Sequence, residues 1–236
     1  MATEVLSDSE LQALRRINSC AVANAIETFG VRLRNTGFTD SSISCVYDNL
    51  PPMVGYAATL RIRTSEPPME GDSYFYRLDW LEHLLSLPKP RVLVIQDLDP
   101  EPGLGAFIGD VHANILAALG CVGVVTNGAV RNVDEIRPLK FQMFAGSLSV
   151  SHAFAHVLDF GKPLAVTRME VRPGELIHGD VHGVQTIPAE VASKVAAVAA
   201  EMMQQEQDVI DLSRSADFTI EKLRAEIDAL REKRKR

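Results

Sequence analysis

Three short segments of this chain carry side chains that could bind or transform a small acid. The first is Gly109-Asp110-Val111-His112, where a glycine precedes the start of a helical pattern. The start of a helix presents unpaired backbone N–H groups and the positive end of the helix dipole, which together suit a carboxylate. Aspartate at such a place is also a common helix cap. On its own, the segment leaves a ligand cradle and a structural turn equally open.

The second segment runs from Asn127 to Glu135 and places Arg131 just past a short apolar stretch and the turn signal Asn127-Gly128. A guanidinium in that position can hold a carboxylate or a carbonyl oxygen by two-point contact. The alternative is a surface ion pair with Asp134 or Glu135, and on these residues alone the ion pair is favoured.

The third segment contains His178, Asp180 and His182, which would share one face of an extended chain. Such a set could hold a metal ion, but the glycines between and after these residues are typical of a hairpin turn, which we consider the better interpretation. His152 and His156 lack the HExxH pattern of a zinc-binding helix. We expect them to be polar residues at the end of an element or at a subunit contact.

The composition is that of a globular protein. The chain has 236 residues, of which 46% are hydrophobic and 23% charged, which suits one compact domain with an extra terminal element. Its net charge of -7 excludes a broad basic surface for nucleic acid. No apolar run approaches the roughly 20 residues that span a bilayer, and the first residues lack the pattern of a signal peptide. We therefore expect a cytoplasmic protein without nucleic-acid or membrane partners.

The three cysteines are Cys20, Cys45 and Cys121, and they form no CxxC pair or zinc-ligand spacing. Neither a disulfide framework nor a zinc site is predicted. Cys20 and Cys121 lie in apolar sequence surroundings, so we expect both to be inert core thiols.

Hydrophobic periodicity predicts an α/β protein. Strands are expected over 54–63, 91–97, 122–126, 164–171, 175–178 and 184–187. Helices are expected from residue 8, and over 20–29, 72–87, 110–119, 189–212 and 220–236. In the centre, a strand, a glycine-rich turn over 103–109, a helix and a second strand follow one another, which predicts parallel pairing. The amphipathic stretch over 220–236 favours a helix packed on a neighbouring subunit or on its own body.

The order and spacing of these motifs resemble those of the RraA-like family, over roughly 11–195. The matching segments are Gly109-Asp110, the Asn-Gly-Ala-Val-Arg run over 127–131, the Val-Arg-Pro-Gly-Glu run over 171–175 and the Asp-Val-His-Gly-Val run over 180–184. The family includes class II 4-hydroxy-4-methyl-2-oxoglutarate/4-carboxy-4-hydroxy-2-oxoadipate aldolases and protein regulators of ribonuclease E. The resemblance implies an α/β sandwich around a β-barrel-like core over 1–188, with a C-terminal helical extension over 189–236. It also implies a homotrimer or a dimer of trimers, with the site at a subunit interface.

The resemblance further implies roles for individual residues. In the aldolases, the residues that match Gly109, Asp110, Val111 and His112 bind pyruvate, in part through backbone N–H groups. The arginine that matches Arg131 contacts the substrate oxygens, and the aspartate directly after it binds Mg²⁺ or Mn²⁺.

This chain departs from the aldolases at that last position, because it has Asn132 where they have aspartate. An amide oxygen can ligate a hard divalent cation but brings no negative charge. Asp110 and Glu135 match acidic positions that the aldolases associate with metal-bound waters. We therefore expect a weakened site for Mg²⁺ or Mn²⁺ at Asn132 and Glu135.

The function that these residues favour is a metal-dependent lyase acting on a small 2-oxo acid through a pyruvate enolate, as an aldolase, an oxaloacetate decarboxylase or both. Arg131 would stabilise the enolate oxygen and Asp110 would position a water that moves protons. The motifs contain no lysine, so a Schiff-base mechanism is not indicated. Two alternatives remain: a non-catalytic regulator that binds a ribonuclease, and an enzyme of the same fold with altered chemistry because of Asn132.

Overall fold

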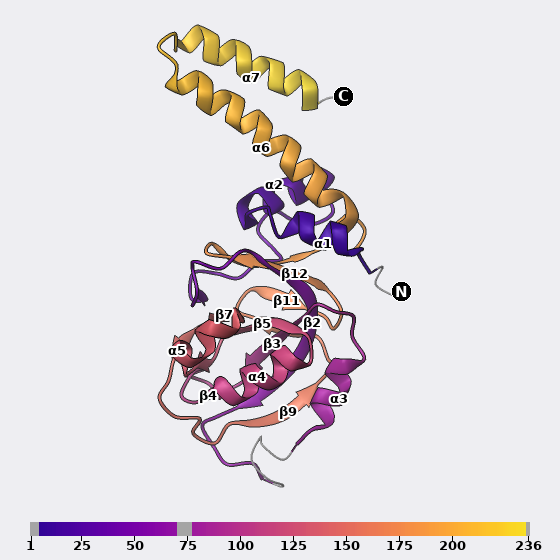
Figure 1. Ribbon diagram of the computed structural model, residues 1–236, viewed down its shortest axis with the longest axis vertical. Helices are drawn as coiled ribbons and strands as arrows, with labels where there is room; N and C mark the ends of the chain where they lie inside the picture. The colour runs from indigo at the N-terminus through magenta and orange to yellow at the C-terminus, as the bar shows by residue number, and fades with distance from the viewer. Residues whose placement is uncertain (1–4, 70–76, 235–236) are drawn as a thin grey trace.

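The computed structural model describes residues 5–69 and 77–234 (Figure 1). Its core is a mixed eight-stranded sheet that curls into a nearly closed, barrel-like shape, which confirms the α/β fold expected from the resemblance. The middle of the sheet consists of four parallel neighbours, β2 (Met53–Arg63), β3 (Arg91–Asp97), β5 (Cys121–Thr126) and β7 (Gln142–Ala145). Antiparallel strands extend it, namely β12 (Leu176–Asp180), β13 (Gly183–Ile187), β9 (His156–Phe160) and β1 (Ser44–Cys45).

The central strands are buried on both faces, and this explains their continuous apolar sequence. In β3, Leu93 and Ile95 belong to the core on one face, while Val92 and Val94 belong to the core on the other. The first face is covered by α3 (Asp79–Leu85) and α4 (Asp110–Ala118), and α5 (Val133–Ile136) lies beside α4 (Figure 1). The second face packs against the hairpin of β10 (Leu164–Val166) and β11 (Met169–Val171).

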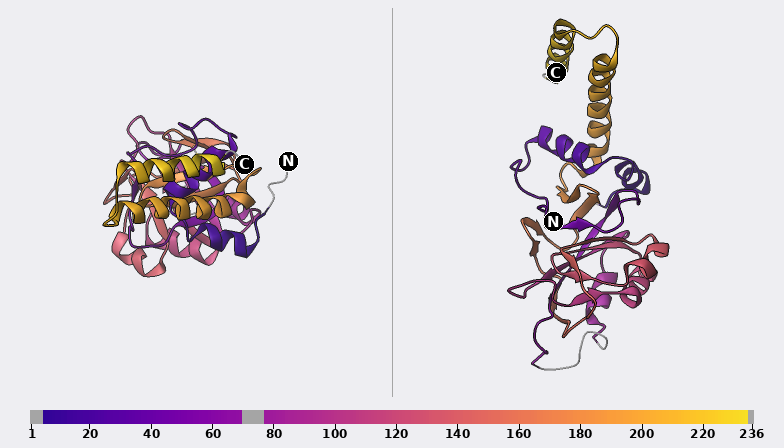
Figure 2. Two further views of the ribbon diagram at one scale, coloured as in Figure 1. Left: turned by 90° about the horizontal axis from the view of Figure 1, so that it is seen from above. Right: turned by 90° about the vertical axis from the view of Figure 1, so that its left-hand side faces the viewer.

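A third apolar cluster joins the two ends of the chain. Here α1 (Asp8–Leu14), α2 (Ser19–Phe29) and the first turns of α6 (Ala192–Arg214) pack together over the ends of β2 and β12. A capping box between Ser7 and Glu10 starts α1, and Gly30 ends α2 in the left-handed region with φ of 63°. Beyond the body, α6 continues outward and α7 (Ile220–Arg234) folds back beside it (Figures 1 and 2).

A second, smaller sheet positions the candidate site. It contains three short parallel strands, β4 (Ala106–Ile108), β6 (Ala129–Val130) and β8 (Ser147–Leu148). The sequence predicts only a glycine-rich turn over 103–109, and this is wrong for the three residues of β4. A strand of two or three residues has too few positions to show an alternating pattern, so its pairing partners determine it.

Several other sequence-based predictions need correction. The stretch 164–171 forms two strands instead of one, because Thr167 adopts a φ of 53° and turns the chain. The helix expected over 72–87 occupies Asp79–Leu85, and the predicted residues 72–76 lie outside the described part of the chain.

The amphipathic helix expected near the C-terminus is present as α7. Within residues 5–69 and 77–234, no helix has both the length and the apolar content to cross a membrane.

Cys20 and Cys121, both predicted to be core thiols, differ in their exposure to solvent. Cys121 is buried in the core beneath α4, as expected, and burial raises the pKa of its thiol to about 12. Cys20 is exposed, so the prediction of a core thiol is wrong at this position. The reason is that Cys20 lies on the outer face of α2, while Ala21 and Val22 face the cluster.

Candidate functional site

The candidate site is formed where the three strands of the small sheet end. Because β4, β6 and β8 are parallel and adjacent, the residues that follow them leave the same edge of the sheet, and these are Gly109, Arg131 and Ser149. Backbone hydrogen bonds fix this arrangement. The Arg131 N–H donates to the Ile108 carbonyl at 2.9 Å, and the Ser149 N–H donates to the Val130 carbonyl at 3.1 Å. Residues far apart in sequence are thereby brought to one edge.

Gly109 leaves room for two polar atoms at this edge. A Cβ atom at Gly109 would lie 3.1 Å from Arg131 Nε, 3.1 Å from Asn132 Oδ1 and 3.3 Å from Arg131 Cγ. The backbone of Gly109 is extended, with φ of -128°, so the glycine is needed for space and not for its conformation. A cationic donor and an amide oxygen therefore face the point where α4 begins.

The first turn of α4 supplies backbone donors next to these atoms. Gly109 is the N-cap residue and Asp110 the first residue of the helix, so Asp110 is not the cap. No side chain caps this end, and the first hydrogen bond within the helix runs from the Ala113 N–H to the Gly109 carbonyl at 3.0 Å. The N–H groups of Asp110 and Val111 precede that bond and suit an anionic ligand.

The ring of His112, a predicted substrate-binding residue, lies in the core. The imidazole stacks on Phe107, with ring centroids 5.1 Å apart, and also lies 6.3 Å from the ring of Trp80. Burial, together with the positive charge of Arg131, lowers the pKa of His112 to about 4. The ring is therefore neutral near pH 7 and does not add positive charge to the site.

Asn132 adopts the left-handed conformation, with φ of 57° and ψ of 39°, directly before α5. Asparagine and aspartate are the non-glycine residues that adopt this conformation most readily, so the backbone selects a short polar side chain here. A hydrogen bond from the Tyr47 hydroxyl to the Val133 carbonyl fixes the first residue of α5. The guanidinium of Arg137 lies over the Tyr47 ring, 5.0 Å from its centroid.

Arg131 is the key charge of the site. The ion pair that the sequence suggested forms elsewhere, since Asp134 lies 3.4 Å from Arg137. In the part of the chain that the structure describes, no carboxylate forms an ion pair with Arg131. Arg131 and Asn132 line a hollow of about 520 Å³ together with the exposed carboxylates Asp134 and Glu135 and with the stretch 148–150. An arginine in a hollow with no direct ion pair to a described residue keeps its N–H groups available for an anion.

The metal-ligand set at this hollow is sparse. Oxygen ligands are available from Asn132 and, in the first turns of α5 and α4, from Glu135 and Asp110. Among residues 5–69 and 77–234, no group of three or more histidine, cysteine, aspartate or glutamate side chains is arranged to hold a metal ion. These residues fit only a cation that keeps much of its water or takes ligands from a substrate, as Mg²⁺ commonly does.

The sequence profile of the RraA-like family, described as Aldolase/RraA, matches residues 19–185. This chain belongs to the RraA-like family. The match confirms the resemblance inferred from the sequence and covers both the candidate site and the hairpin of β12 and β13.

Relatives and solved structures agree with this assignment. A protein from Halalkalibacterium halodurans, which carries the provisional name 4-hydroxy-4-methyl-2-oxoglutarate aldolase, is 31% identical over 84 residues, which is 35% of this chain and 40% of that protein. A protein from Pseudomonas syringae pv. tomato has the same fold with a TM-score of 0.74 at 19% identity, covering 95% of this chain and 97% of that one. Streptomyces coelicolor RraAS2, described as an unusual member of the RNase ES inhibitor RraA family, has a TM-score of 0.66 at 20% identity over 86% of this chain and 96% of that one. The chain spans less than half the length of the first two curated relatives that it matches.

Behind the site of this RraA-like protein, a buried aspartate holds two turns together. Asp97 ends β3, and its carboxylate accepts hydrogen bonds from the Gly103 N–H at 2.9 Å and the Asp99 N–H at 3.1 Å. The side chain of Asn127 accepts from the Asp97 N–H at 2.8 Å and donates to the Asp97 carbonyl at 2.9 Å. Burial raises the pKa of Asp97. Sequence reasoning missed this support, although an acidic residue at the end of a buried strand was a signal for it.

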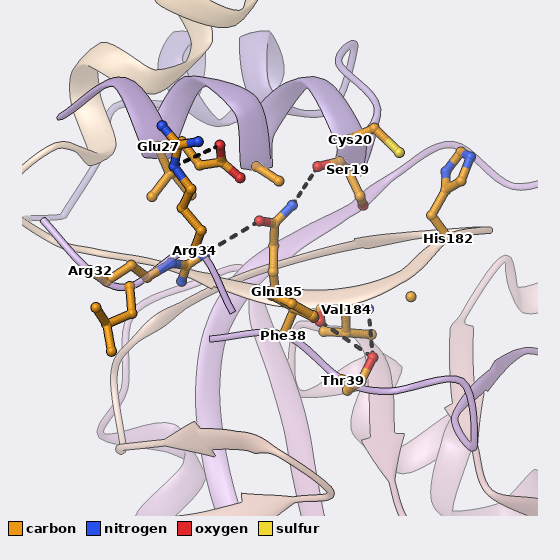
Figure 3. A pocket seen from close by; sticks show the side chains of 14 residues that line it. Ser19, Cys20, Glu27, Arg32, Arg34, Phe38, Thr39, His182, Val184 and Gln185 are labelled. Carbon is orange, nitrogen blue, oxygen red and sulfur yellow. Dashed lines mark hydrogen bonds and ion pairs between the residues drawn. The ribbon is translucent and has the colours of Figure 1, made fainter. Parts of the chain in front are cut away.

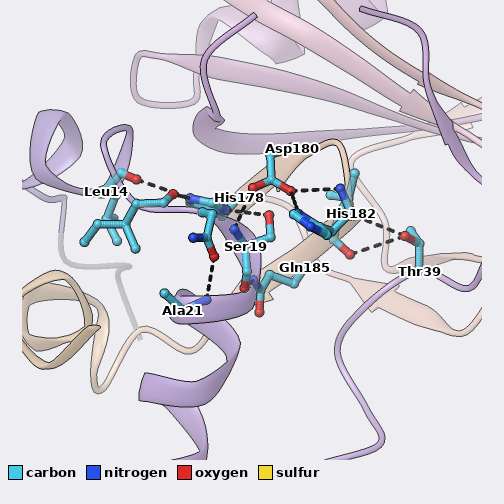
Figure 4. Close-up of polar contacts among 11 residues, drawn as sticks. Leu14, Ser19, Ala21, Thr39, His178, Asp180, His182 and Gln185 are labelled. Atoms are coloured by element: carbon cyan, nitrogen blue, oxygen red, sulfur yellow. Dashed lines mark hydrogen bonds and ion pairs between the residues drawn. The ribbon is translucent and has the colours of Figure 1, made fainter. Parts of the chain in front are cut away.

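The segment with His178, Asp180 and His182 forms a set of hydrogen bonds, here called the clasp, with the start of α2 (Figure 4). His178 is fully buried, and its ring nitrogens contact Ser19 Oγ at 3.1 Å and the Ile17 carbonyl at 3.0 Å. Asp180 accepts from the Ser19 N–H at 2.7 Å and pairs with His182 Nδ1 at 3.0 Å. These contacts join the start of α2 to the hairpin of β12 and β13, and the hairpin interpretation is confirmed.

The other histidine pair is not on a helix. His156 is buried at the start of β9, whereas His152 is exposed in the loop before it. Their four-residue spacing therefore does not place them on one face, because the chain between them turns at Ala153, which has a φ of 47°.

Proposed function

We propose that this RraA-like protein is a divalent-metal-dependent lyase that cleaves a carbon–carbon bond of a small 2-oxo acid and leaves pyruvate. The observation that carries the proposal is the grouping at Gly109. Arg131 Nε and Asn132 Oδ1 both lie where a Cβ of Gly109 would contact them, next to the uncapped start of α4. The aldolase name of the relative from Halalkalibacterium halodurans supports the same reaction class.

Separate groups of the chain would bind the substrate carboxylate, stabilise the 2-oxo oxygen and transfer the proton. The N–H groups that begin α4 bind the substrate carboxylate, since a helix N-terminus favours an anion. Arg131 has no ion-pair partner among the described residues, so its guanidinium is available for the 2-oxo oxygen. When the carbon–carbon bond breaks, its electrons pass toward that oxygen, and a fixed positive charge stabilises the resulting enolate. Asp110 is half-buried beside the same N–H groups and moves a proton to or from the substrate through water.

A bound Mg²⁺ or Mn²⁺ would supply a Lewis acid that withdraws electrons from the 2-oxo group. Asn132 and Glu135 would hold the ion. Asp110, the first residue of α4, would lie beside the N–H groups that bind the carboxylate. Asparagine supplies oxygen without charge, so we propose that the site depends on the substrate carboxylate for part of its affinity.

A trimer, or a dimer of trimers, would complete this site. Four large apolar side chains near the hollow are exposed, namely Leu104 at 59%, Val111 at 47%, Leu148 at 61% and Val150 at 96%. Exposed apolar surface of this kind around a polar hollow favours coverage by a second subunit. We propose that the neighbouring subunit closes the hollow and sets specificity for the substrate beyond its pyruvyl half.

Pyruvate release tests the proposal. Oxaloacetate and 4-hydroxy-4-methyl-2-oxoglutarate are supplied with Mg²⁺, with Mn²⁺ or with EDTA, and metal without protein is the blank. We expect activity that EDTA abolishes and that Arg131→Ala reduces by at least about 100-fold, since it removes the charge at the developing oxyanion. Arg77→Ala is the matched control, because Arg77 pairs with Asp79 away from the hollow. Equal activity in Arg131→Ala and wild type would contradict the assigned role.

Asn132 favours a second candidate function. Loss of the carboxylate expected from the aldolases suits a non-catalytic regulator that binds a ribonuclease, or an enzyme of the same fold with different chemistry. Asn132→Asp decides between these and the lyase, and its left-handed backbone accepts either residue. If wild type is inactive with both metals and Asn132→Asp releases pyruvate, the native protein is not a lyase of this class. Retention on an immobilised ribonuclease scaffold segment would then identify the regulator.

A further inference from the structure

A second cavity, separate from the candidate site, lies between α2, the segment 31–39 and the hairpin of β12 and β13 (Figure 3). Its volume is about 270 Å³, and it shares no lining residue with the hollow at Arg131. The sides are mostly apolar and include Ala23, Ile26, Phe38 and Val184. The lyase proposal does not use this space, and two residues of the clasp, Ser19 and His182, form part of its lining.

Arg32 lines one end of the cavity and is held in place by neutral groups. Its Nη1 donates to the Thr186 carbonyl at 2.8 Å and to Thr186 Oγ1 at 3.1 Å, and its Nη2 donates to Gln185 Oε1 at 3.4 Å. The guanidinium also lies directly against Gly37, where any side chain would collide with it. Arg32 is thus positioned by carbonyl, hydroxyl and amide oxygens, and none of these neutralises its charge.

The charges around the cavity do not balance at this end. The nearby carboxylate is Glu27, which forms its ion pair with Arg34 at 3.4 Å. Within the described residues, Arg32 has no carboxylate at ion-pair distance. Burial lowers the pKa of Arg32, and the negative charge of Glu27 offsets part of that effect. Arg32 and Arg34 therefore share the one carboxylate of Glu27, and these three side chains together carry one excess positive charge.

We propose that this cavity binds a small organic carboxylate with a compact apolar body. The carboxylate would lie on the Nε and Nη2 edge of the Arg32 guanidinium, because Nη1 already donates to oxygens of Thr186 and Gly37. The apolar body would lie against Ala23, Ile26 and Phe38. One excess positive charge suits a monoanion, and a volume just below the roughly 300–1,000 Å³ of drug-sized pockets suits a ligand of modest size.

Calorimetric titration of the full chain with benzoate tests this proposal, with benzamide as its neutral analogue. We expect saturable binding of benzoate with a Kd of about 1 mM or tighter, and binding of benzamide at least about tenfold weaker. Arg32→Gln should weaken benzoate binding at least about tenfold. Ala23→Phe should abolish it by filling the cavity, while Arg32 and its contacts stay in place. Ala23 is on the surface of α2, so this variant keeps a decisive result if Arg32→Gln unfolds.

Benzoate could also reach the candidate active site, and Arg131→Ala separates the two. Binding that is unchanged in Arg131→Ala but lost in Ala23→Phe supports the second cavity, whether or not the protein is a lyase. Equal affinities for benzoate and benzamide, the absence of saturable benzoate binding, or binding that survives in Ala23→Phe would each overturn the proposal.

Discussion

Gly109→Ala should separate the function of the candidate site from the stability of the fold. The added Cβ would lie 3.1 Å from both Arg131 Nε and Asn132 Oδ1. Carbon makes its best non-bonded contacts at about 3.5–4.0 Å, so both side chains must move by a few tenths of an ångström. The backbone needs no change, because a φ of -128° is open to alanine.

The expected magnitudes follow from this geometry. Replacing glycine by alanine where the backbone is compatible stabilises a protein by about 0.4–1 kcal/mol, and crowding against the two side chains offsets part of that gain. We therefore expect little net change in the free energy of unfolding. A misplacement of 1 Å in a reacting group can cost about 100-fold in rate, so a shift of a few tenths combined with a partly filled cradle should cost about tenfold in kcat/KM. That loss corresponds to about 1.4 kcal/mol.

Two measurements on each variant check this prediction. Urea unfolding gives stability, and pyruvate release together with calorimetric oxalate binding reports on the site. Gly30→Ala is the matched control, because Gly30 has a φ of 63° and no atom within 4 Å of an added Cβ. This control should lose about 1 kcal/mol of stability and keep full activity. A folded Gly109→Ala protein with wild-type kcat/KM and oxalate affinity would refute the reasoning, since Arg131 and Asn132 would then act away from Gly109.

Three further predictions concern the groups that support the fold and site. Asn127→Ala removes both hydrogen bonds to the Asp97 backbone and should lower the free energy of unfolding by about 1–3 kcal/mol in urea; an unchanged midpoint would contradict this. His178→Ala should cost about 2–4 kcal/mol, because it leaves buried Ser19 and Ile17 groups unpaired and opens a cavity; a loss below about 1 kcal/mol would argue against the clasp. The folded-state pKa of His112, about 4, lies below its ordinary value of 6.5, so its contribution is fully present above pH 6.5 and is lost as the pH falls toward 4. His112→Phe should flatten the unfolding free energy in that window, by about 3 kcal/mol at most, whereas an identical pH profile would show that the ring is not held neutral.

Much of the fold was predictable because its pattern is local. The run Val-Leu-Val-Ile over 92–95 indicated a strand buried on both faces, and the structure places its side chains alternately in two cores. The end of α2 at Gly30 and the start of α4 after Gly109 followed from glycine chemistry and helix periodicity. The motifs at 109–110, 127–131, 171–175 and 180–184 together carried the family resemblance that the match over residues 19–185 confirmed.

Cys20 and His178 show where local pattern was insufficient. Both have apolar neighbours in sequence, yet Cys20 is exposed and His178 is buried within a hydrogen-bonded clasp. Which face of a helix or strand meets the core depends on elements far away in the sequence. For His178, those elements are α1 and α2, more than 150 residues earlier.

The sequence by itself determined the types of residue at the candidate site: an arginine, an amide in place of the aldolase carboxylate, and a glycine before a helix. Only the tertiary structure decided that they meet. Strands β4, β6 and β8 are each too short to appear in the pattern, and they form because parallel partners satisfy their backbone groups. That pairing brings Gly109 and Arg131 to one edge, and Asp134 pairs with Arg137 and not with Arg131.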